Sequence, residues 1–204
     1  MPKVAITGSL CSGKSETLKV LKRLGVKVLD IDHITLKLYR RGAPLYKRIV
    51  REFGGGVLGR RRNIDRSKLA QVVFSSSRNL NKLNKITHPA LIKHLKDFLK
   101  RNKGDVAVEV PLLFEKGLDR LFDCTILVKS PRKLRISRAR NRGLSLYQLR
   151  RRLCFQMPEV EKARRADFII NNNKTKQDLK RKVVELWRRV KIQKTTPLKK
   201  RRPQ

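Results

Sequence analysis

A glycine-rich octapeptide near the start of the sequence constrains the fold more than any other feature. The residues Gly8-Ser9-Leu10-Cys11-Ser12-Gly13-Lys14-Ser15 follow an apolar run at 3–6 and lead into a helical pattern. The spacing GxxxxGK(S/T), placed between a strand and a helix, allows backbone N–H groups to surround a phosphate. In such a loop the lysine neutralises phosphate oxygens and the hydroxyl after it ligates Mg²⁺. We therefore predict a nucleoside-triphosphate site here; the alternative is an ordinary turn before a helix.

Short β-branched runs alternate along the chain with longer basic, amphipathic segments. Strands are expected at 3–6, 26–30, 105–110, 124–128 and 167–170. Helices are expected at 14–24, 33–40, 43–53, 66–74, 78–85, 88–102, 131–141, 145–155 and 174–190. This alternation predicts a doubly wound α/β sheet of buried parallel strands, whose ligands lie beyond the carboxyl ends of the strands. With 204 residues, the chain is long enough for one core of this kind.

The second expected strand ends in two carboxylates, Asp30 and Asp32. We expect this strand to lie beside the one that leads into the loop, where a carboxylate can orient or deprotonate an attacking hydroxyl. The alternative is that the two aspartates are a pair of helix N-caps, a role that suits Asp32 because a helical pattern follows it directly. The residues alone leave both interpretations open.

The chain carries 53 Lys and Arg against 16 Asp and Glu, which gives a formal charge of +37. Such a field attracts polyanions, among them nucleic acid and phosphorylated small molecules, but does not specify a fold. Residues 191–204 contain six of the cations and no carboxylate, so residues 1–190 still carry +31 (37 minus 6). The segment 191–204 has little to bury, and we expect a disordered tail there.

Other features concern the compartment of the protein. The three cysteines are widely spaced, no charged-then-apolar leader opens the sequence, and no apolar run reaches the length of a membrane span. These features favour a soluble, cytoplasmic protein with reduced thiols and no membrane partner. The oligomeric state is left open.

Seven further segments follow one another along the chain: LGVKVLDID, FGGGVL, IDRSKLAQVVF, LNKITHPALI, EVPLLFEKGLDRLFD, RLCFQMP and ADFIINNN. Together with the loop they resemble the dephospho-CoA kinase family over residues 3–185. The resemblance implies a three-layer P-loop kinase fold with a five-stranded parallel sheet, a helical CoA-binding lobe near 36–104 and a helical lid near 131–165, all within a domain of residues 1–190. It also implies phosphoryl transfer from ATP, with Mg²⁺, to the ribose 3′-hydroxyl of dephospho-CoA.

The same resemblance assigns roles to single residues. Lys14 and Ser15 match the family's P-loop lysine and magnesium-binding serine, and Asp32 matches the second aspartate of a D-x-D pair, the catalytic base. Glu109 matches a carboxylate of the magnesium shell that is more often aspartate in the family, and Glu115 matches a later glutamate for which a surface or cap role is equally open. The substrate-binding positions implied are Asp32, His88, Pro111 and Leu112.

The family's lid carries an R-x-x-x-R pattern that closes over the triphosphate. In the segment RISRARNRGLS, Arg138 and Arg142 fit this pattern best if one residue is deleted before GLS, and Arg140 is the alternative. By spacing alone these arginines indicate a solvated helix face. The second half of the lid is matched by Arg152, Gln156 and Lys162.

The loop departs from the family's usual sequence at three positions. Ser9 and Cys11 stand where glycine is usual, and Glu16 stands where threonine is usual. Because Ser9 and Cys11 occupy variable positions of the motif, we expect phosphate binding to survive in a stiffer loop. A helix N-terminus favours the thiolate, which would make Cys11 reactive; the alternative is an unreactive buried thiol.

Two other functions remain from the residues. One is a P-loop kinase of another nucleoside or nucleotide, and the other is a basic P-loop protein that binds nucleic acid. Against the latter, aromatic residues make up only 5% of the chain, and no RNP or helix-turn-helix signature is present. We expect at most weak, nonspecific nucleic-acid binding through the basic surface and tail.

Overall fold

The computed structural model describes the backbone of residues 1–193 and their side chains, except those of Asp32, His33 and Arg152. It divides the chain into two compact units, one made of residues 1–29 with the segment from 101 onward, and one made of residues 30–100. Most of the tail expected at 191–204 lies outside the described residues. Within the described part, no helix combines the length and the apolar character that a bilayer crossing requires.

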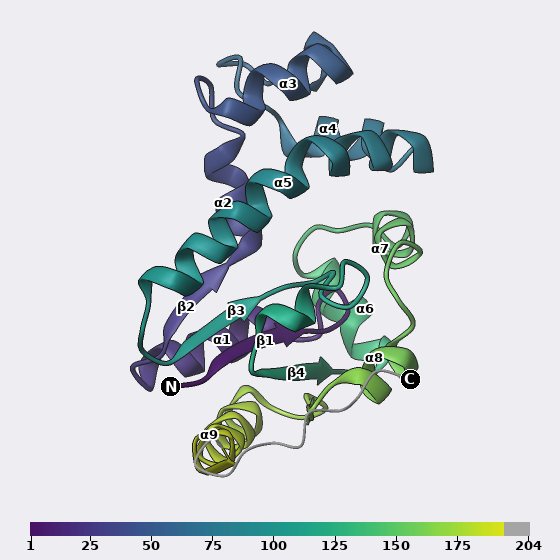
Figure 1. Ribbon diagram of the computed structural model, residues 1–204. Coiled ribbons are helices and arrows are strands. Elements are labelled where there is room, and N and C mark those ends of the chain that lie inside the picture. The colour runs from purple at the N-terminus through teal and green to yellow at the C-terminus, as the bar shows by residue number, and fades with distance from the viewer. Residues whose placement is uncertain (194–204) are drawn as a thin grey trace. The chain divides into compact units, whose positions relative to one another are not determined.

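A five-stranded parallel sheet forms the centre of the first unit (Figure 1). Its strands are β1 (Lys3–Thr7), β2 (Lys27–Asp30), β3 (Val106–Glu109), β4 (Cys124–Lys129) and β5 (Phe168–Asn171), in the order β2-β3-β1-β4-β5. β1 pairs in parallel with β3 and with β4, so that Ile6 lies opposite both Glu109 and Ile126. The glycine loop therefore begins at the middle of the sheet, at its carboxyl edge. All five expected strands and the α/β class are confirmed.

The expectation that β2 lies beside the loop strand is wrong, because β3 lies between them. A crossover between parallel strands can skip a position in the sheet, and the sequence of the crossover does not show that it does. The strand beside β1 is β3, and it ends in Glu109, which lies opposite Ile6. The acidic residue closest to β1 in the sheet is consequently Glu109 and not Asp30.

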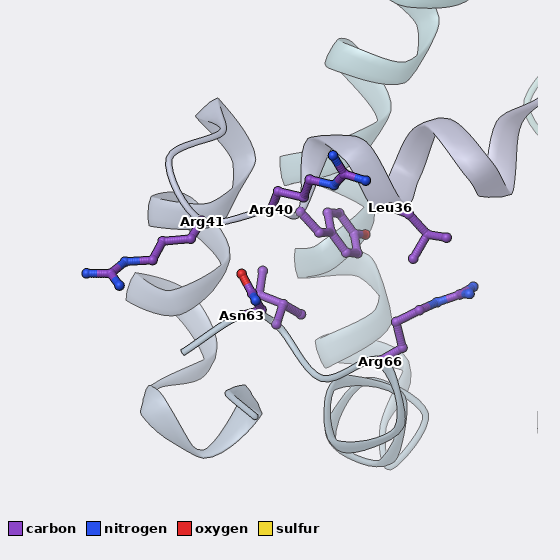
Figure 2. A pocket seen from close by; sticks show the side chains of 7 residues that line it. Leu36, Arg40, Arg41, Asn63 and Arg66 are labelled. Atoms are coloured by element: carbon purple, nitrogen blue, oxygen red, sulfur yellow. The ribbon is translucent and has the colours of Figure 1, made fainter. Parts of the chain in front are cut away.

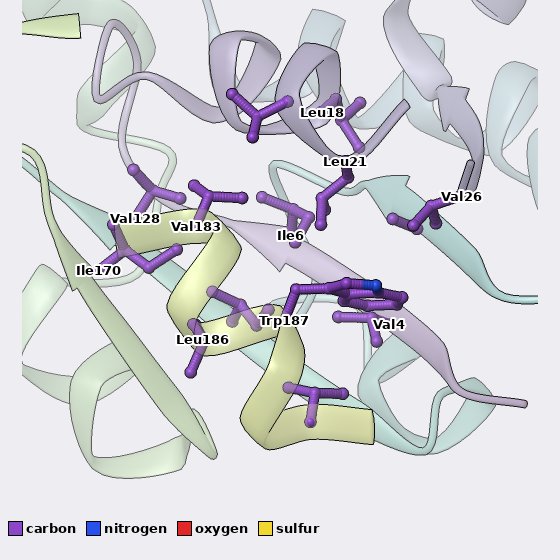
Figure 3. Packing of buried hydrophobic residues seen from close by; sticks show 14 of the residues in the cluster. Val4, Ile6, Leu18, Leu21, Val26, Val128, Ile170, Val183, Leu186 and Trp187 are labelled. Atoms are coloured by element: carbon purple, nitrogen blue, oxygen red, sulfur yellow. The ribbon is translucent and has the colours of Figure 1, made fainter. Parts of the chain in front are cut away.

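Two helices, α1 (Lys14–Arg23) and α9 (Lys176–Gln193), pack against each other and against the sheet. Val4 and Ile6 of β1 are fully buried between them, and Trp187 of α9 is only 4% exposed (Figure 3). Burying an apolar side chain of this size stabilises the fold by about 1.5–3 kcal/mol. The loop is therefore held at both ends by buried elements, β1 before it and α1 after it.

Three shorter helices and a 3₁₀ turn (Leu118–Leu121) complete the first unit; the helices are α6 (Arg132–Arg140), α7 (Leu146–Leu153) and α8 (Glu159–Arg165). α7 begins with a capping box in which Ser145 and Gln148 bond each other's backbone N–H groups. α8 was not expected, because seven residues with few apolar positions give little periodicity. Its charges could have revealed it, since Glu159 and Glu161 lie in its first turn and basic residues in its last, an arrangement that the helix dipole favours.

The second unit is helical and has a core of its own. It contains α2 (Ile31–Leu38), α3 (Pro44–Phe53), a 3₁₀ turn (Gly55–Val57), α4 (Arg66–Val73) and α5 (Ser77–Arg101), which ends one residue beyond the unit. The buried residues of this core are Leu45, Ile49, Val57, Leu69, Val73 and Ile86. They come from every helix after α2, so the unit is stabilised by contacts among its own elements.

The two helices expected at 78–85 and 88–102 are one continuous helix, α5, with Pro89 inside it. Proline removes a single N–H, so only the carbonyl of Lys85 loses its helical donor. Buried Ile86 and partly buried Ala90 pack on the unit's core on both sides of this position. Tertiary packing thus maintains the helix where the local sequence suggested a break.

Candidate active site

The loop between β1 and α1 packs closely at both ends, against Val128 at Gly8 and against Asn172 at Gly13. Gly8 and Gly13 have φ values of 145° and 111°, a region that side chains rarely adopt. A Cβ at Gly8 would lie 2.3 Å from the carbonyl oxygen of Val128, and one at Gly13 would lie 2.2 Å from Nδ2 of Asn172. Cys11 also has a positive φ, of 62°. The close packing fixes the shape of the loop before any ligand binds.

The lysine of the loop is buried inside this cradle. Lys14 Nζ donates to the carbonyl oxygen of Ser9 at 3.1 Å and lies 3.6 Å from Oε1 of Glu109. The side chains of Lys14 and Glu109 are each only 6% exposed. A desolvated cation interacts more strongly with an anion than one in water does. A phosphate at the loop would therefore meet a charge that is already in position.

The residues present fit a triphosphate and a magnesium ion. Ser12 is fully buried in the loop, and within the described part of the chain its Oγ has no hydrogen-bond partner, so it can donate to a phosphate oxygen. Ser15, the second residue of α1, is exposed. The hydroxyl of Ser15 and the carboxylate of Glu109 are hard oxygen donors of the kind that Mg²⁺ prefers.

Arg138 of α6 donates hydrogen bonds to backbone carbonyl groups of the loop. One terminal nitrogen, Nη1, donates to Ser130 Oγ at 2.9 Å and to the carbonyl oxygens of Cys11 and Ser12 at 3.4 Å each. The other, Nη2, donates to the carbonyl oxygen and Oδ1 of Asn172, at 3.3 and 3.4 Å. Because this guanidinium binds loop carbonyls, it stabilises their outward orientation. The predicted contact of Arg138 with phosphate stays a prediction.

Asn172 supports the loop from the end of β5, and our sequence analysis did not identify it. Its Nδ2 donates to the carbonyl oxygen of Ser12 at 2.7 Å, and the residue is 5% exposed. A signal was present, because three consecutive asparagines, 171–173, follow an apolar strand at the sheet edge where ligands gather. The sequence does not tell which of the three turns toward the loop.

A buried ion pair ties the segment after β3 to α8. Lys162 is fully buried, with Nζ 2.8 Å from Oε1 of Glu115 and 3.1 Å from the carbonyl oxygen of Pro111, to which it donates. The same Oε1 accepts from the backbone N–H of Met157 at 2.8 Å. Glu115 is thus neither on the open surface nor a helix cap. Pro111, expected near the substrate, has its carbonyl bonded to Lys162, and Leu112 beside it is half-buried.

The remaining loop residues contact the helices expected to form the lid. Ser9 Oγ donates to Oε1 of Glu159 at 3.2 Å. Cys11, 5% exposed, packs with Ala139 of α6 and Leu149 of α7, and Leu10 packs against the same cluster. Leu10 and Cys11 therefore pack on an apolar cluster of these helices, with Cys11 buried and Leu10 partly buried. Glu16 lies in the first turn of α1, where its Oε2 is 3.6 Å from Nζ of Lys19.

The other cysteines differ from Cys11 in their surroundings. Cys154 is exposed, whereas Cys124 is buried in β4. Burial, reinforced by nearby Asp167 and Asp123, raises the pKa of the Cys124 thiol to about 12. This thiol stays protonated and unreactive at neutral pH.

Several predicted residues lie away from the loop contacts described above. Arg140 and Arg142 are exposed. In the helical unit, His88 is a half-buried residue of α5. Of the two aspartates expected as possible helix caps, Asp30 stands immediately before α2, whereas Asp32 lies inside its first turn, so the cap position is wrong for Asp32. The side chains of Asp32 and Arg152 are outside the described part of the structure.

A parallel sheet with a glycine loop at its centre, a buried lysine in the loop and a helix after it define a P-loop nucleotide-binding protein. The comparisons with known proteins specify the family. A family model described as dephospho-CoA kinase matches residues 3–178. A dephospho-CoA kinase from Aquifex aeolicus (strain VF5) is 36% identical over 189 residues, which are 92% of this chain and 96% of the relative.

Solved structures agree with this match. TT1252 from Thermus thermophilus has a TM-score of 0.75 and 34% identity, with 93% of this chain and 98% of that chain covered. A dephospho-CoA kinase from Campylobacter jejuni has a TM-score of 0.65 and 28% identity, with 92% and 96% covered. The chain belongs to the dephospho-CoA kinase family, and the predicted resemblance and kinase fold are confirmed.

Proposed function

We propose that the chain transfers the γ-phosphoryl group of ATP to the ribose 3′-hydroxyl of dephospho-CoA, which completes coenzyme A. The observation that supports this most strongly is the family match over residues 3–178, together with a loop whose lysine is already buried at the phosphate site. The reduced cysteines and the need for ATP favour the cytoplasm as the compartment.

The loop contributes charge and position. Its backbone N–H groups and Lys14 hold the β- and γ-phosphates, and Ser12 adds a hydroxyl donor. Arg138 and Asn172 keep the loop in the required shape from outside. Transfer in line between a positioned donor and acceptor needs no covalent intermediate.

Ser15 and Glu109 would hold the magnesium ion. When bound, Mg²⁺ supplies charge neutralisation at the β- and γ-phosphate oxygens. Glu109 also lies 3.6 Å from Lys14, so the same carboxylate sets the position of the loop's cation. These two roles make Glu109 the acidic residue of the phosphate site.

Asp32 is the proposed base, supported by its match to the family's D-x-D pair. It orients the 3′-hydroxyl and accepts its proton. Arg142, or Arg140, reaches the triphosphate when the lid segment 131–165 closes, and closure keeps water from the transferred group. His88 and Leu112 are the proposed contacts with the acceptor.

The test is a panel of acceptors with ATP and Mg²⁺: dephospho-CoA, adenosine, AMP, CMP and an oligonucleotide. We expect coenzyme A from dephospho-CoA, with the other acceptors used far less well. Product is identified by mass, so that ATP hydrolysis is not mistaken for transfer. Phosphorylation of another nucleoside or nucleotide in the absence of coenzyme A formation would replace this proposal.

A further inference from the structure

The two units each contain a feature that the contacts described so far leave out. The helical unit has a pocket of about 340 Å³, lined by Arg40, Arg41 and Arg66 together with Tyr39 (Figure 2). The helical unit is the lobe that the family resemblance assigns to CoA, so this pocket belongs to the acceptor side of the proposed reaction. The first unit contains a fully buried cation, Lys162, to which the proposed reaction assigns no role.

Lys162 connects α8 to the segment that follows β3. Its Nζ donates to the carbonyl oxygen of Pro111 at 3.1 Å and lies 2.8 Å from Oε1 of Glu115. Oγ1 of Thr7 donates to the same carbonyl oxygen at 3.5 Å. Thr7 is the last residue of β1, directly before the glycine loop. The carbonyl of Pro111 therefore has one donor from α8 and one from the end of β1, which together fix the start of the segment after β3.

Both ends of α8 are held in the same way. At its first residue, Oε1 of Glu159 accepts from Oγ of Ser9 in the glycine loop at 3.2 Å. At its last residue, Cζ of Arg165 lies 4.8 Å from the centre of the Phe114 ring, and Nη2 lies 3.6 Å from Oδ2 of Asp119. α8 thus contacts the phosphate loop and the segment after β3 at once, and it links the two.

The stability of the fold does not by itself explain why a charge pair is buried here. Desolvation of two charges costs free energy, and apolar residues of similar volume often stabilise a protein as well or better. An ammonium group, however, has three donors, so Lys162 can bind a carboxylate and a backbone carbonyl at the same time. An apolar side chain cannot hold a carbonyl in this way. The carbonyl that Lys162 holds belongs to Pro111, the residue immediately before Leu112, which is a proposed acceptor contact.

We propose that Lys162 is a positioning residue for the acceptor. By holding Pro111, it fixes Leu112 relative to the end of β1, and hence relative to the phosphate that the loop binds. In-line transfer is sensitive to this alignment, because a displacement of about 1 Å can lower the rate about 10²-fold. Since separating a buried ion pair is costly, α8 stays fixed when the rest of the lid segment closes. This inference rests on the proposed function, which places the acceptor beside Leu112.

The experiment measures steady-state constants for the two substrates separately. The variant K162M/E115Q lacks the donor to Pro111 but leaves no unpaired buried charge, and the glutamine oxygen can still accept from Met157 N–H. We expect kcat/KM for dephospho-CoA to fall about tenfold or more, with KM for ATP within about twofold of the wild-type value. Lys116→Met, an exposed position of the same segment, is the matched control and should leave both constants within about twofold.

Hydrogen exchange tests the contact without depending on turnover. In the segment after β3, Gly117 N–H donates to the carbonyl oxygen of Phe114 at 3.2 Å, and Leu118 N–H donates to that of Leu113 at 2.9 Å. In K162M/E115Q we expect these two amides to exchange about tenfold faster, the scale of one lost hydrogen bond from a charged group. The amides of β1 and α1 should keep their wild-type rates. Thermal unfolding of each variant shows that it is folded at the temperature of the measurement.

Three results would overturn the proposal. An unchanged kcat/KM for dephospho-CoA in K162M/E115Q would mean that the buried pair serves the fold alone. An equal rise in KM for ATP and for dephospho-CoA would mean that α8 positions the phosphate loop and not the acceptor. Unchanged exchange at Gly117 and Leu118 would mean that Lys162 does not hold the segment. Coenzyme A formation by the wild-type protein is measured first, so that a failure of the proposed function is distinguished from a failure of this inference.

Discussion

The cations around the glycine loop and those of the helical unit have the same chemistry but opposite surroundings. Lys14 and Lys162 are 6% and 0% exposed and lie within 3.6 Å of a carboxylate. Arg40, Arg61 and Arg66 are exposed. A buried cation is held at one position by the protein, whereas an exposed one adapts to the anion that arrives. Burial and partners, and not the total of +37, therefore indicate which cations belong to the reaction.

The largest effect that we expect comes from the buried cation at the loop. Lys14→Ala should lower kcat/KM by about 10³-fold, the scale for losing a preorganised charge at a transition state, and should weaken ATP binding as well. Lys19→Ala, an exposed position on the same helix, is the matched control and should change kcat/KM less than about twofold. Comparable losses in both variants would remove the distinction between buried and exposed cations.

The second buried cation should matter for stability. Lys162→Ala leaves the carboxylate of Glu115 without its cation, so we expect the free energy of unfolding to fall by about 3 kcal/mol in urea titrations. The double variant K162M/E115L should lose less, because it removes both buried charges. A loss below about 1 kcal/mol for Lys162→Ala would mean that this buried pair contributes no more to stability than a surface ion pair does.

A carboxylate of the predominantly basic helical unit provides the next test. Asp32→Asn should lower kcat by about 10²-fold, the usual scale for a general base, while ATP affinity changes only a few-fold. Asp30→Asn is the companion variant, and we expect it to retain more activity. Near-normal turnover in Asp32→Asn would mean that Asp30 is the general base or that the reaction uses none.

Arg138→Lys separates charge from geometry. Lysine keeps the charge but not the fork that contacts Cys11, Ser12 and Asn172, so we expect a loss of about tenfold, equivalent to one hydrogen bond from a charged group. The loss should fall mainly on KM for ATP, because the loop changes shape. Arg132→Lys, an exposed position of α6, is the control. Equal KM values in the two variants would show that the contacts of Arg138 do not position the loop.

The smallest effect should come from the end of the chain. α9 extends to Gln193, and Lys191 lies 2.9 Å from Asp105, so the truncation is best made after Gln193. Removal of residues 194–204 should leave dephospho-CoA turnover within about twofold and reduce the salt slope of nucleic-acid binding. A folded truncation with most of its turnover lost would place the tail at the active site.

The sequence predicted what local patterns encode and failed where distant segments meet. The five strands and the loop follow from apolar runs and glycine spacing, which are local. The position of β2 depends on how a crossover passes over the sheet. The contacts of Arg138 depend on where α6 docks, and the pairing of Lys162 with Glu115 joins residues far apart in the chain. No spacing rule distinguishes these two cations from the many that stay exposed.

The glycines of the loop limit how this gene can vary. Every amino acid other than glycine carries a Cβ, and at Gly8 and Gly13 that atom would overlap a neighbour at 2.3 and 2.2 Å. No missense change at either codon is structurally silent, whatever nucleotide is altered. At Gly25, by contrast, φ is 84° and nothing lies within 4 Å of a Cβ, so asparagine, which accepts positive φ, can stand there. We therefore expect substitutions to be tolerated far less well at these two glycines than at Gly25, which lies just beyond the end of α1.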